Sequence, residues 1–353
     1  MRHLTDILSY RFGSLNMIPD VTPNGVFYLP PTGWLTSFYN PPTITSMAKR
    51  KKKQNLIYLS LIIIVAAIIG GSWFYSHHTR EVSNSYAVSE TATLSSDARV
   101  YNSLSAIQRA NLPDQALVKV NRYYLTSNDN DDTYARITYN GKNYFVRATD
   151  IELKMNNEIN SYLTQSGLPH AKITKQISSI FEQRGYSTSS GNPRGVVIHD
   201  TGNENSTISS EVSYMKQNYS STRVFVHTFI GNQQILNIAD TKYMAEGAGP
   251  YANPYFVQFE MPHEYTAASF ANQLGNAAYY TAYILKQNNL PVTKGTKDGG
   301  GTVWTHAMIS SYLGGTDHED PISYWSTTAR KLFGTTYNIN NFVELVQAYY
   351  NQM

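Results

Sequence analysis

Histidine and carboxylate side chains that could bind a metal ion or transfer a proton are concentrated in the C-terminal half of the sequence. His199 ends the apolar run 196–198, and Glu260 ends the mostly apolar run 256–259. Ligand crevices in open α/β sheets lie at the carboxyl ends of buried strands. Both side chains are therefore expected to emerge where a buried strand ends, which is where a catalytic group can reach a ligand.

Another histidine and a neighbouring His-Asp pair occupy further element boundaries. His306 follows the glycine-rich loop 299–301 and a short run of four residues, and it directly precedes a segment with a helical pattern. Pro321 biases Asp320 toward an extended backbone. Because side chains alternate along an extended chain, His318 and Asp320 are then expected on one face. An imidazole and a carboxylate would point into the same space.

These residue types form a standard ligand set for catalytic zinc. Zinc binds imidazole nitrogen and carboxylate oxygen tetrahedrally, so two histidines and one aspartate leave a fourth position for water. Zinc-bound water becomes acidic near neutral pH, and hydrolysis also needs a base and an oxyanion contact. We predict Glu260 as the base and His318 as the oxyanion contact. The chain has no cysteine, which excludes thiolate metal sites and disulfides, whereas other divalent ions remain possible at such a site.

Other features of this region have simpler explanations. His227 alternates onto the same face as Phe225 and Phe229, which favours a packed or supporting histidine over a fourth metal ligand. His263 is expected in a loop at the rim of a groove. The glycines 299–301 lack the lysine and the preceding strand of a phosphate-binding loop, so a flexible loop is the better interpretation.

The elements that must position these residues alternate between strand and helix patterns. Apolar runs predict strands within 195–203, at 223–230 and at 255–260. Helices are predicted at 157–163, 171–184, 267–289, 307–313 and 341–350. This mixture predicts one α/β domain over residues 156–353, with flanking helices packed on a central mixed β-sheet.

The segment from about 195 to 350 resembles zinc-dependent N-acetylmuramoyl-L-alanine amidases of the peptidoglycan-recognition type, in particular Gram-positive autolysin amidases. The matching pieces, in the order of the family, are VVIHDTGN, VHTFIGNQQI, EGAGPYANPYFVQFE and TVWTHAMISSYLGGTDHEDP. The resemblance implies Zn²⁺ as cofactor, bound by His199, His306 and Asp320. It also implies that Glu260 is the general base and that His318 stabilises the tetrahedral intermediate. The residues MPHEY after Glu260 depart from the usual apolar continuation of the family.

The resemblance implies a hydrolase that cuts the amide between N-acetylmuramic acid and L-alanine of peptidoglycan. One alternative is a catalytically silent receptor or scaffold that only binds peptidoglycan, although a pure binder has no need for a base beside an open metal site. Another alternative is a zinc peptidase that cuts within the stem peptide. Only analysis of the products distinguishes the peptidase from the amidase.

Residues 98–155 are predicted to form a small all-β module. Three strand-like segments follow one another, and Asn140-Gly141 between the last two is a strong signal for a hairpin. This stretch resembles a bacterial SH3-like module, which implies either binding of cell-wall material or a spacer. The preceding residues 76–97 are rich in Ser, Thr and Ala, and we predict a flexible linker there.

Residues 56–75 form an uncharged, mostly apolar run that is long enough to cross a bilayer as a helix. Five cations at 49–53 precede it and only Arg80 follows closely, so a cytoplasmic N-terminus is predicted, with the catalytic domain in the cell-wall space of a Gram-positive cell. A cytoplasmic segment 1–55 would precede this signal anchor. Its proline-rich part, 1–46, is interpreted as an over-extended gene start, with translation beginning at Met47.

Charge excludes a general nucleic-acid partner. The net charge is +3, and without the five cations of 49–53 the remaining chain carries −2. The expected partners are peptidoglycan and, through residues 56–75, a membrane. The sequence does not indicate an oligomeric state.

Overall fold

The computed structural model describes residues 56, 58–68, 80–106, 109–127 and 132–353. The chain divides into two units, residues 1–67 and 68–353. Residues 58–68 are helical and exposed. No helix within the described ranges combines the length and the apolar character that a membrane crossing requires. The predicted segment 1–55 lies outside the described residues, as do Ile57 and residues 69–75 of the predicted span.

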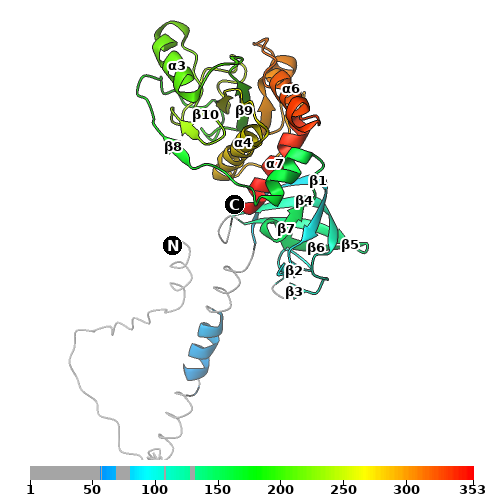
Figure 1. Cartoon of the computed structure of the whole chain (residues 1–353). Helices are drawn as coiled ribbons and strands as arrows, with labels where there is room; N and C mark the ends of the chain where they lie inside the picture. Colours follow the sequence, from blue (N-terminus) through cyan, green and yellow to red (C-terminus); the bar gives the residue numbers. More distant parts are fainter. Residues whose placement is uncertain (1–55, 57, 69–79, 107–108, 128–131) are drawn as a thin grey trace, which may run out of the picture. The chain divides into compact units, whose positions relative to one another are not determined.

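A six-stranded mixed sheet carries His199 and Glu260, and the α/β character predicted for 156–353 is confirmed (Figure 1). Its spatial order is β13, β9, β12, β10, β11, β8, and the first four strands run parallel to one another. β11 pairs antiparallel with β10, and β8 pairs parallel with β11. The strands are β8 (Ile173–Lys175), β9 (Gly195–Asp200), β10 (Thr228–Ile230), β11 (Ile235–Asn237), β12 (Phe256–Met261) and β13 (Val303–Thr305).

Helices cover this sheet because their apolar stripes match its buried strands. In α4 (Ala267–Gln287), Phe270 and Leu274 are fully buried against the core of the sheet, and Thr266 begins the helix with a capping box. α4 and α7 pack against each other. The remaining helices are α2 (Glu158–Gln165), α3 (Ile208–Thr222), α5 (His306–Met308), the π-helical turn η2 (Ile309–Leu313), α6 (Ile322–Phe333) and α7 (Ile339–Gln352).

Most of the predicted elements are confirmed, but the helix predicted at 171–184 is wrong. Residues 173–175 form β8. The backbone N–H of Gln176 donates to the carbonyl of Asn237 at the end of β11, and that of Ser178 donates to the carbonyl of Ile238 directly after it. Ile177 and Ile180 are 44% and 46% exposed, so this segment has no continuous buried apolar stripe. The free edge of β11 offers hydrogen-bond partners to the backbone of this segment. A helix here would have no apolar face to bury, so the strand is the more stable alternative. The strand predicted at 223–230 is shorter than expected, because Arg223 is the left-handed C-cap of α3.

A second sheet, of seven strands, precedes the α/β part. Its order is β3, β2, β6, β5, β4, β1, β7, and every neighbouring pair is antiparallel. The strands are β1 (Val82–Leu94), β2 (Val100–Tyr101), β3 (Arg109–Ala110), β4 (Leu117–Thr126), β5 (Thr133–Tyr139), β6 (Lys142–Arg147) and β7 (Ile151–Leu153), with a 3₁₀ turn η1 (Ala148–Asp150). The hairpin at Asn140-Gly141 is confirmed, since both residues have positive φ between β5 and β6.

The flexible linker predicted at 76–97 is wrong for residues 82–94, which form β1, the longest strand of this sheet. β1 pairs with β4 on one side and with β7 on the other. Its Ser, Thr and Ala content suits a spacer when taken alone. However, Tyr86, Ala92 and Leu94 are buried, and the flanking strands satisfy its backbone.

This sheet and the α/β part belong to the same compact unit, and polar side chains join them. Tyr86 on β1 donates a hydrogen bond to Gln347 on α7 (3.0 Å), and Asn351 on α7 donates to Tyr123 on β4 (3.2 Å). Tyr123 in turn donates to the Glu90 carboxylate (2.9 Å). The C-terminal helix is therefore held by both sheets.

Glu90 provides a stability test of this junction. Burial raises its pKa to about 7, and the negative charge of Glu344 adds to this rise, while the hydrogen bond from Tyr123 opposes it. The folded protein binds the Glu90 proton more tightly than the unfolded chain does, and this preference stabilises the fold. The stabilisation is complete below the unfolded-state pKa of about 4.3 and is lost as the pH rises through about 7. Between about pH 4.5 and about pH 8, we expect Glu90→Gln to remove roughly 2 kcal/mol of the pH dependence of the unfolding free energy.

Urea unfolding of the full chain at both pH values measures this difference. Glu152→Gln, an exposed carboxylate on β7, is the matched control and should leave the pH profile unchanged. Parallel profiles for the parent and Glu90→Gln would contradict the expectation.

Candidate active site

Three parallel strands deliver their end residues to one edge of the mixed sheet. His199 and Glu260 stand directly opposite each other in the register of β9 and β12. β13 pairs with the other side of β9, and His306 follows its last residue as the first residue of α5. A loop completes the group, because the Ala307 N–H donates to the Asp320 carbonyl (3.0 Å) and holds Asp320 beside the same edge.

His199, His306 and Asp320 converge on one point. The two Nδ1 atoms are 2.9 Å apart, and the Asp320 oxygens lie 3.3 Å from Nδ1 of His199 and 3.0 Å from Nδ1 of His306. Ligands about 2.0–2.1 Å from a tetrahedral zinc ion stand roughly 3.3 Å from each other. All three side chains are largely buried, with exposed fractions of 2%, 3% and 15%. The ligand atoms, their spacing and their burial therefore fit one divalent metal ion.

The electrostatics of the cluster favour the protonation states that bind metal. Burial lowers the pKa of His199, although hydrogen bonding and the charge of Asp320 oppose this effect. Burial alone would raise the pKa of Asp320, but hydrogen bonds and positive charge from His199 and His306 outweigh burial and lower it. A neutral imidazole and an ionised carboxylate are the forms that bind a metal ion.

The far nitrogen of His306 has a partner that orients the ring. Its Nε2 lies 3.0 Å from the Thr316 hydroxyl. Because Nδ1 faces the cluster, Nε2 carries the proton and donates it to Thr316 in the metal-binding tautomer. No sequence pattern pointed to Thr316, which was missed although it stands two residues before His318.

His318 covers one side of the cluster. Its ring stacks on His306 at 4.6 Å, and its Nδ1 lies 3.5 Å from an Asp320 oxygen. The side chain is 65% exposed, so it borders both the cluster and the solvent. This position allows an N–H of His318 to reach an oxygen of a bound ligand.

Glu260 is half-buried, and its Oε2 is shielded from solvent and has no hydrogen-bond partner among the described residues. Burial raises its pKa well above the ordinary value, and the negative charges of Asp320 and Asp200 raise it further. A carboxylate with a raised pKa accepts a proton more readily than an exposed one. Its environment and its place beside His199 suit a general base.

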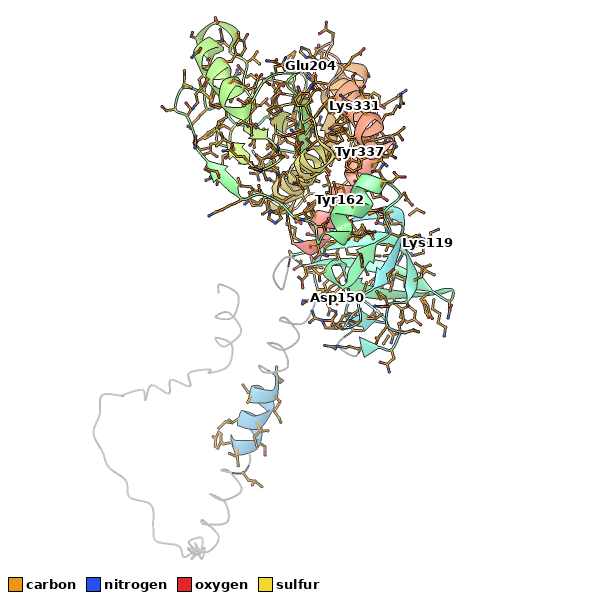
Figure 2. The ribbon with its side chains drawn as sticks, in the orientation of Figure 1. Lys119, Asp150, Tyr162, Glu204, Lys331 and Tyr337 are labelled. Atoms are coloured by element: carbon orange, nitrogen blue, oxygen red, sulfur yellow. The ribbon has the colours of Figure 1, made fainter. Side chains whose placement is uncertain are left out.

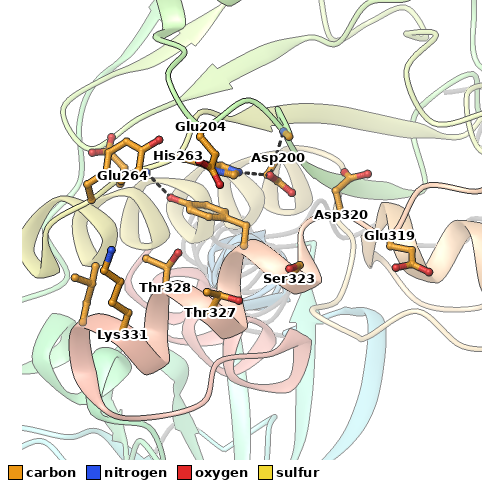
Figure 3. A pocket seen from close by; sticks show the side chains of 14 residues that line it. Asp200, Glu204, His263, Glu264, Glu319, Asp320, Ser323, Thr327, Thr328 and Lys331 are labelled. Atoms are coloured by element: carbon orange, nitrogen blue, oxygen red, sulfur yellow. Dashed lines mark hydrogen bonds and ion pairs between the residues drawn. The ribbon is translucent and has the colours of Figure 1, made fainter.

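A cleft with a volume of about 490 Å³ opens beside Asp320 (Figure 3). One wall is built by His263, which pairs with Asp200 and stacks on Tyr324 with ring centroids 4.1 Å apart. The Glu264 N–H donates to the Tyr324 hydroxyl (2.8 Å) and fixes this wall. His263 therefore lies in a loop at the rim of a groove, as predicted. Asp200 and Tyr324 were not assigned roles from the sequence.

A second hollow, of about 440 Å³, lies on the side of His318. It is rich in hydroxyl groups, and its lining shares Glu319 and Ser323 with the cleft. The two hollows flank the loop that carries Asp320. A bond held at the cluster would have space for substituents on both sides.

His227 is not part of the cluster. It is fully buried, its Nδ1 accepts a hydrogen bond from the Gln258 N–H (3.0 Å), and its Nε2 lies 2.8 Å from the Tyr243 carbonyl. Burial lowers its pKa to about 4. The prediction of a packed histidine is confirmed.

Comparisons with known proteins agree with this geometry. Residues 189–323 match the family described as N-acetylmuramoyl-L-alanine amidase. Protein Ami of Listeria monocytogenes is 42% identical over 196 residues, which cover 56% of this chain and 20% of that protein. A bifunctional autolysin of Staphylococcus epidermidis is 44% identical over 171 residues, covering 48% of this chain and 13% of that protein. This chain thus spans a fifth or less of these relatives.

A solved structure covers a similar share of this chain. The Staphylococcus aureus hydrolase AmiA, in complex with its ligand, superposes with a TM-score of 0.51 at 38% sequence identity. The match covers 56% of this chain and 92% of that one.

Proposed function

Because the chain belongs to the N-acetylmuramoyl-L-alanine amidase family, we propose that it is a cell-wall hydrolase acting on the amide bond between N-acetylmuramic acid and L-alanine of peptidoglycan. The observation that carries this proposal is the convergence of His199, His306 and Asp320, with Glu260 opposite His199 in the register. A protein that only binds peptidoglycan needs neither the open ligand set nor a base beside it.

His199, His306 and Asp320 would hold Zn²⁺, since two imidazole nitrogens and one carboxylate oxygen at this spacing suit a tetrahedral ion with one open position. When bound, zinc supplies Lewis-acid chemistry, which acidifies water and polarises the scissile carbonyl. Burial of the three ligands keeps bulk water from competing for the site.

Glu260 would take the proton from the attacking water, whose oxygen adds to the lactyl carbonyl carbon. The exposed N–H of His318 would donate a hydrogen bond to the oxygen that becomes negative. Glu260 would then pass its proton to the leaving nitrogen as the carbon–nitrogen bond breaks. The products are a free lactyl carboxylate on the sugar and a free amino group on L-alanine.

Mass spectrometry of purified wall digested by the full chain tests this function. New L-alanine amino termini with intact glycan strands are expected, and they should vanish after chelation and return with Zn²⁺. New termini elsewhere in the stem peptide would indicate a peptidase. Retention of muropeptides by the zinc-loaded chain without any product would indicate a binding protein.

The contact between Thr316 and His306 gives a further prediction. Thr316→Val removes the acceptor for the His306 N–H while keeping the shape of the side chain. We expect the affinity for Zn²⁺ to fall by about 10- to 100-fold, because the orientation of the ring is lost. Competition with a chromophoric chelator measures this, and Thr336→Val, an exposed threonine, serves as the control. Equal affinities in all three proteins would contradict a role for Thr316.

We further propose that residues 56–75 anchor the protein in the membrane with its catalytic part in the cell-wall space. The uncharged apolar run and the five preceding cations support this topology. The division into a β module and a catalytic domain at residue 156 and the SH3-like character of the module are retained as proposals, with the module now beginning at β1. Protease protection of sealed membranes, read with antibodies to either end, tests the topology.

A further inference from the structure

The junction between the β module, defined here as the sheet β1–β7, and the α/β part is held by polar side chains. Each part has its own hydrophobic core, and among the described residues no buried side chain belongs to both cores. Parts of a chain that meet through polar contacts, rather than through one shared apolar core, commonly move relative to each other. The junction can therefore open without breaking either core.

One chain of hydrogen bonds crosses this junction and ends at Glu90. The Tyr86 hydroxyl donates to the Gln347 side-chain oxygen, and the Gln347 amide donates to the Asn351 side-chain oxygen (2.7 Å). The Asn351 amide donates to the Tyr123 hydroxyl, which donates to Oε2 of Glu90. Both tyrosines lie on the β module, both amides lie on α7, and all four side chains are buried. Every donor in this chain points toward the Glu90 carboxyl.

Glu90 lies on the core-facing side of β1. Its partner across the pair with β4 is Val120, a fully buried member of the core of the β module. Residues directly opposite each other on antiparallel strands point to the same face of the sheet. Ala92, two positions further along β1, is buried as well, which fits the alternation of side chains along a strand. A charge at this position is costly unless a cation pairs with it.

The groups that face Glu90 are acidic or phenolic. Glu344 on α7 places a negative charge near it, and the phenols of Tyr86 and Tyr123 stay neutral because burial raises their pKa. Among the described residues, no lysine, arginine or histidine forms an ion pair with Glu90. The charged side chains on the adjoining stretches of β4 and β7 are exposed: Lys119, Glu152 and Lys154. Burial, and after it the charge of Glu344, therefore raises the pKa of Glu90 to about 7.

We propose that protonated Glu90 locks the β module onto α7 and that ionised Glu90 releases it. The protonated carboxyl still accepts the hydrogen bond from Tyr123, so the chain across the junction stays complete. The ionised carboxylate faces the negative charge of Glu344 at a half-buried position, and opening the junction returns it to solvent. The open form is therefore favoured as the pH rises. This inference concerns the arrangement of the two parts and does not depend on the hydrolase function proposed above.

The docking equilibrium follows the protonation of Glu90. The docked protein binds the proton with a pKa of about 7, whereas Glu90 in the open form is expected near the ordinary value of about 4.3. The docking constant is therefore highest below about pH 4.3 and falls as the pH rises through about 7. Because Glu90 is only half-buried, solvent screens part of this effect, and we expect a fall of roughly 30-fold.

The chain has no cysteine, so two introduced thiols can carry dyes that report the arrangement of the parts. Lys119→Cys/Arg330→Cys places one dye on β4 and the other on α6, both at exposed positions. Figure 2 labels Lys119 and Lys331, the residue that follows Arg330. Förster transfer in the labelled full chain, kept in neutral detergent, is expected to be efficient at about pH 4.5 and to fall at about pH 8, where the junction opens.

Glu90→Gln is uncharged at both pH values, so its transfer efficiency should stay high at both. Glu344→Gln should reduce the change between the two pH values, because the facing charge is gone, and it decides the question if Glu90→Gln does not fold. Glu152→Gln, an exposed carboxylate on β7, is the matched control and should behave like the parent.

Three results would overturn the proposal. The first is an equal transfer efficiency of the labelled parent at both pH values. The second is a change with pH that persists in Glu90→Gln or, if that variant does not fold, a change in Glu344→Gln that equals the change in the parent. The third is a loss of circular dichroism in the parent at the higher pH, since both parts must stay folded when the junction opens.

Discussion

Glu260→Gln is expected to lower kcat for muropeptide cleavage by about 10²- to 10⁴-fold, which is the usual contribution of a general base. Glutamine keeps the size of the side chain but cannot accept the proton of the attacking water. The carboxyl is well suited to this loss-of-function test because its Oε2 is shielded from solvent near the end of β12 and because burial raises its pKa. Steady-state kinetics on a soluble muropeptide measure the effect.

Zinc content should distinguish a lost base from a damaged site. Glu260→Gln is expected to bind Zn²⁺ as well as the parent does, since Glu260 is not among the three converging ligands. Glu158→Gln is the matched control and should keep the activity of the parent, because Glu158 is an exposed carboxylate on α2 and is not among the groups that raise the pKa of Glu260. An unchanged kcat in Glu260→Gln would remove this residue from the mechanism.

Asp320→Asn is expected to lower the affinity for Zn²⁺ by more than about 100-fold and to abolish cleavage at ordinary zinc concentrations. Loss of an outer partner of a metal ligand already costs about 10- to 100-fold, so loss of a charged ligand should exceed this range. The substitution also removes the negative charge between two imidazoles whose Nδ1 atoms are 2.9 Å apart. Metal analysis after dialysis, together with activity across a zinc titration, measures both effects.

Asp317→Asn is the appropriate control, because Asp317 is an exposed carboxylate in the same loop. It should keep its zinc and most of its activity. Full zinc occupancy in Asp320→Asn would show that the metal binds elsewhere or through other ligands. Recovery of activity at high zinc in the asparagine variant would still support the assignment, since asparagine keeps one ligand oxygen.

Local patterns in the sequence were enough to predict the elements that bring the site together. The apolar runs before His199 and Glu260 form the buried strands β9 and β12, and the apolar stripe of 267–289 forms α4. A strand that is buried on both faces needs a continuous run of apolar residues, and a helix that is buried on one side needs an apolar stripe. Both patterns can be recognised within a short segment of the sequence. The residue types at the strand ends then indicated a metal site.

The short elements were harder to predict because their state depends on distant partners. β8 is a strand only because the edge of β11 lies beside it, and β1 is a strand because β4 and β7 flank it. Neither segment contains a pattern that excludes a helix or a linker. Backbone hydrogen bonds supplied from elsewhere in the chain decide the outcome.

By itself, then, the sequence determined which side chains could bind a metal, where the main strands and helices lie, and which family the C-terminal half resembles. Only the tertiary structure decided that Thr316 orients His306 and that His263 and Tyr324 build a wall of the cleft. The reason is physical. The apolar pattern that determines which residues are buried is visible in the local sequence. Contacts between side chains depend instead on strand register and loop conformation, which bring together residues far apart in sequence.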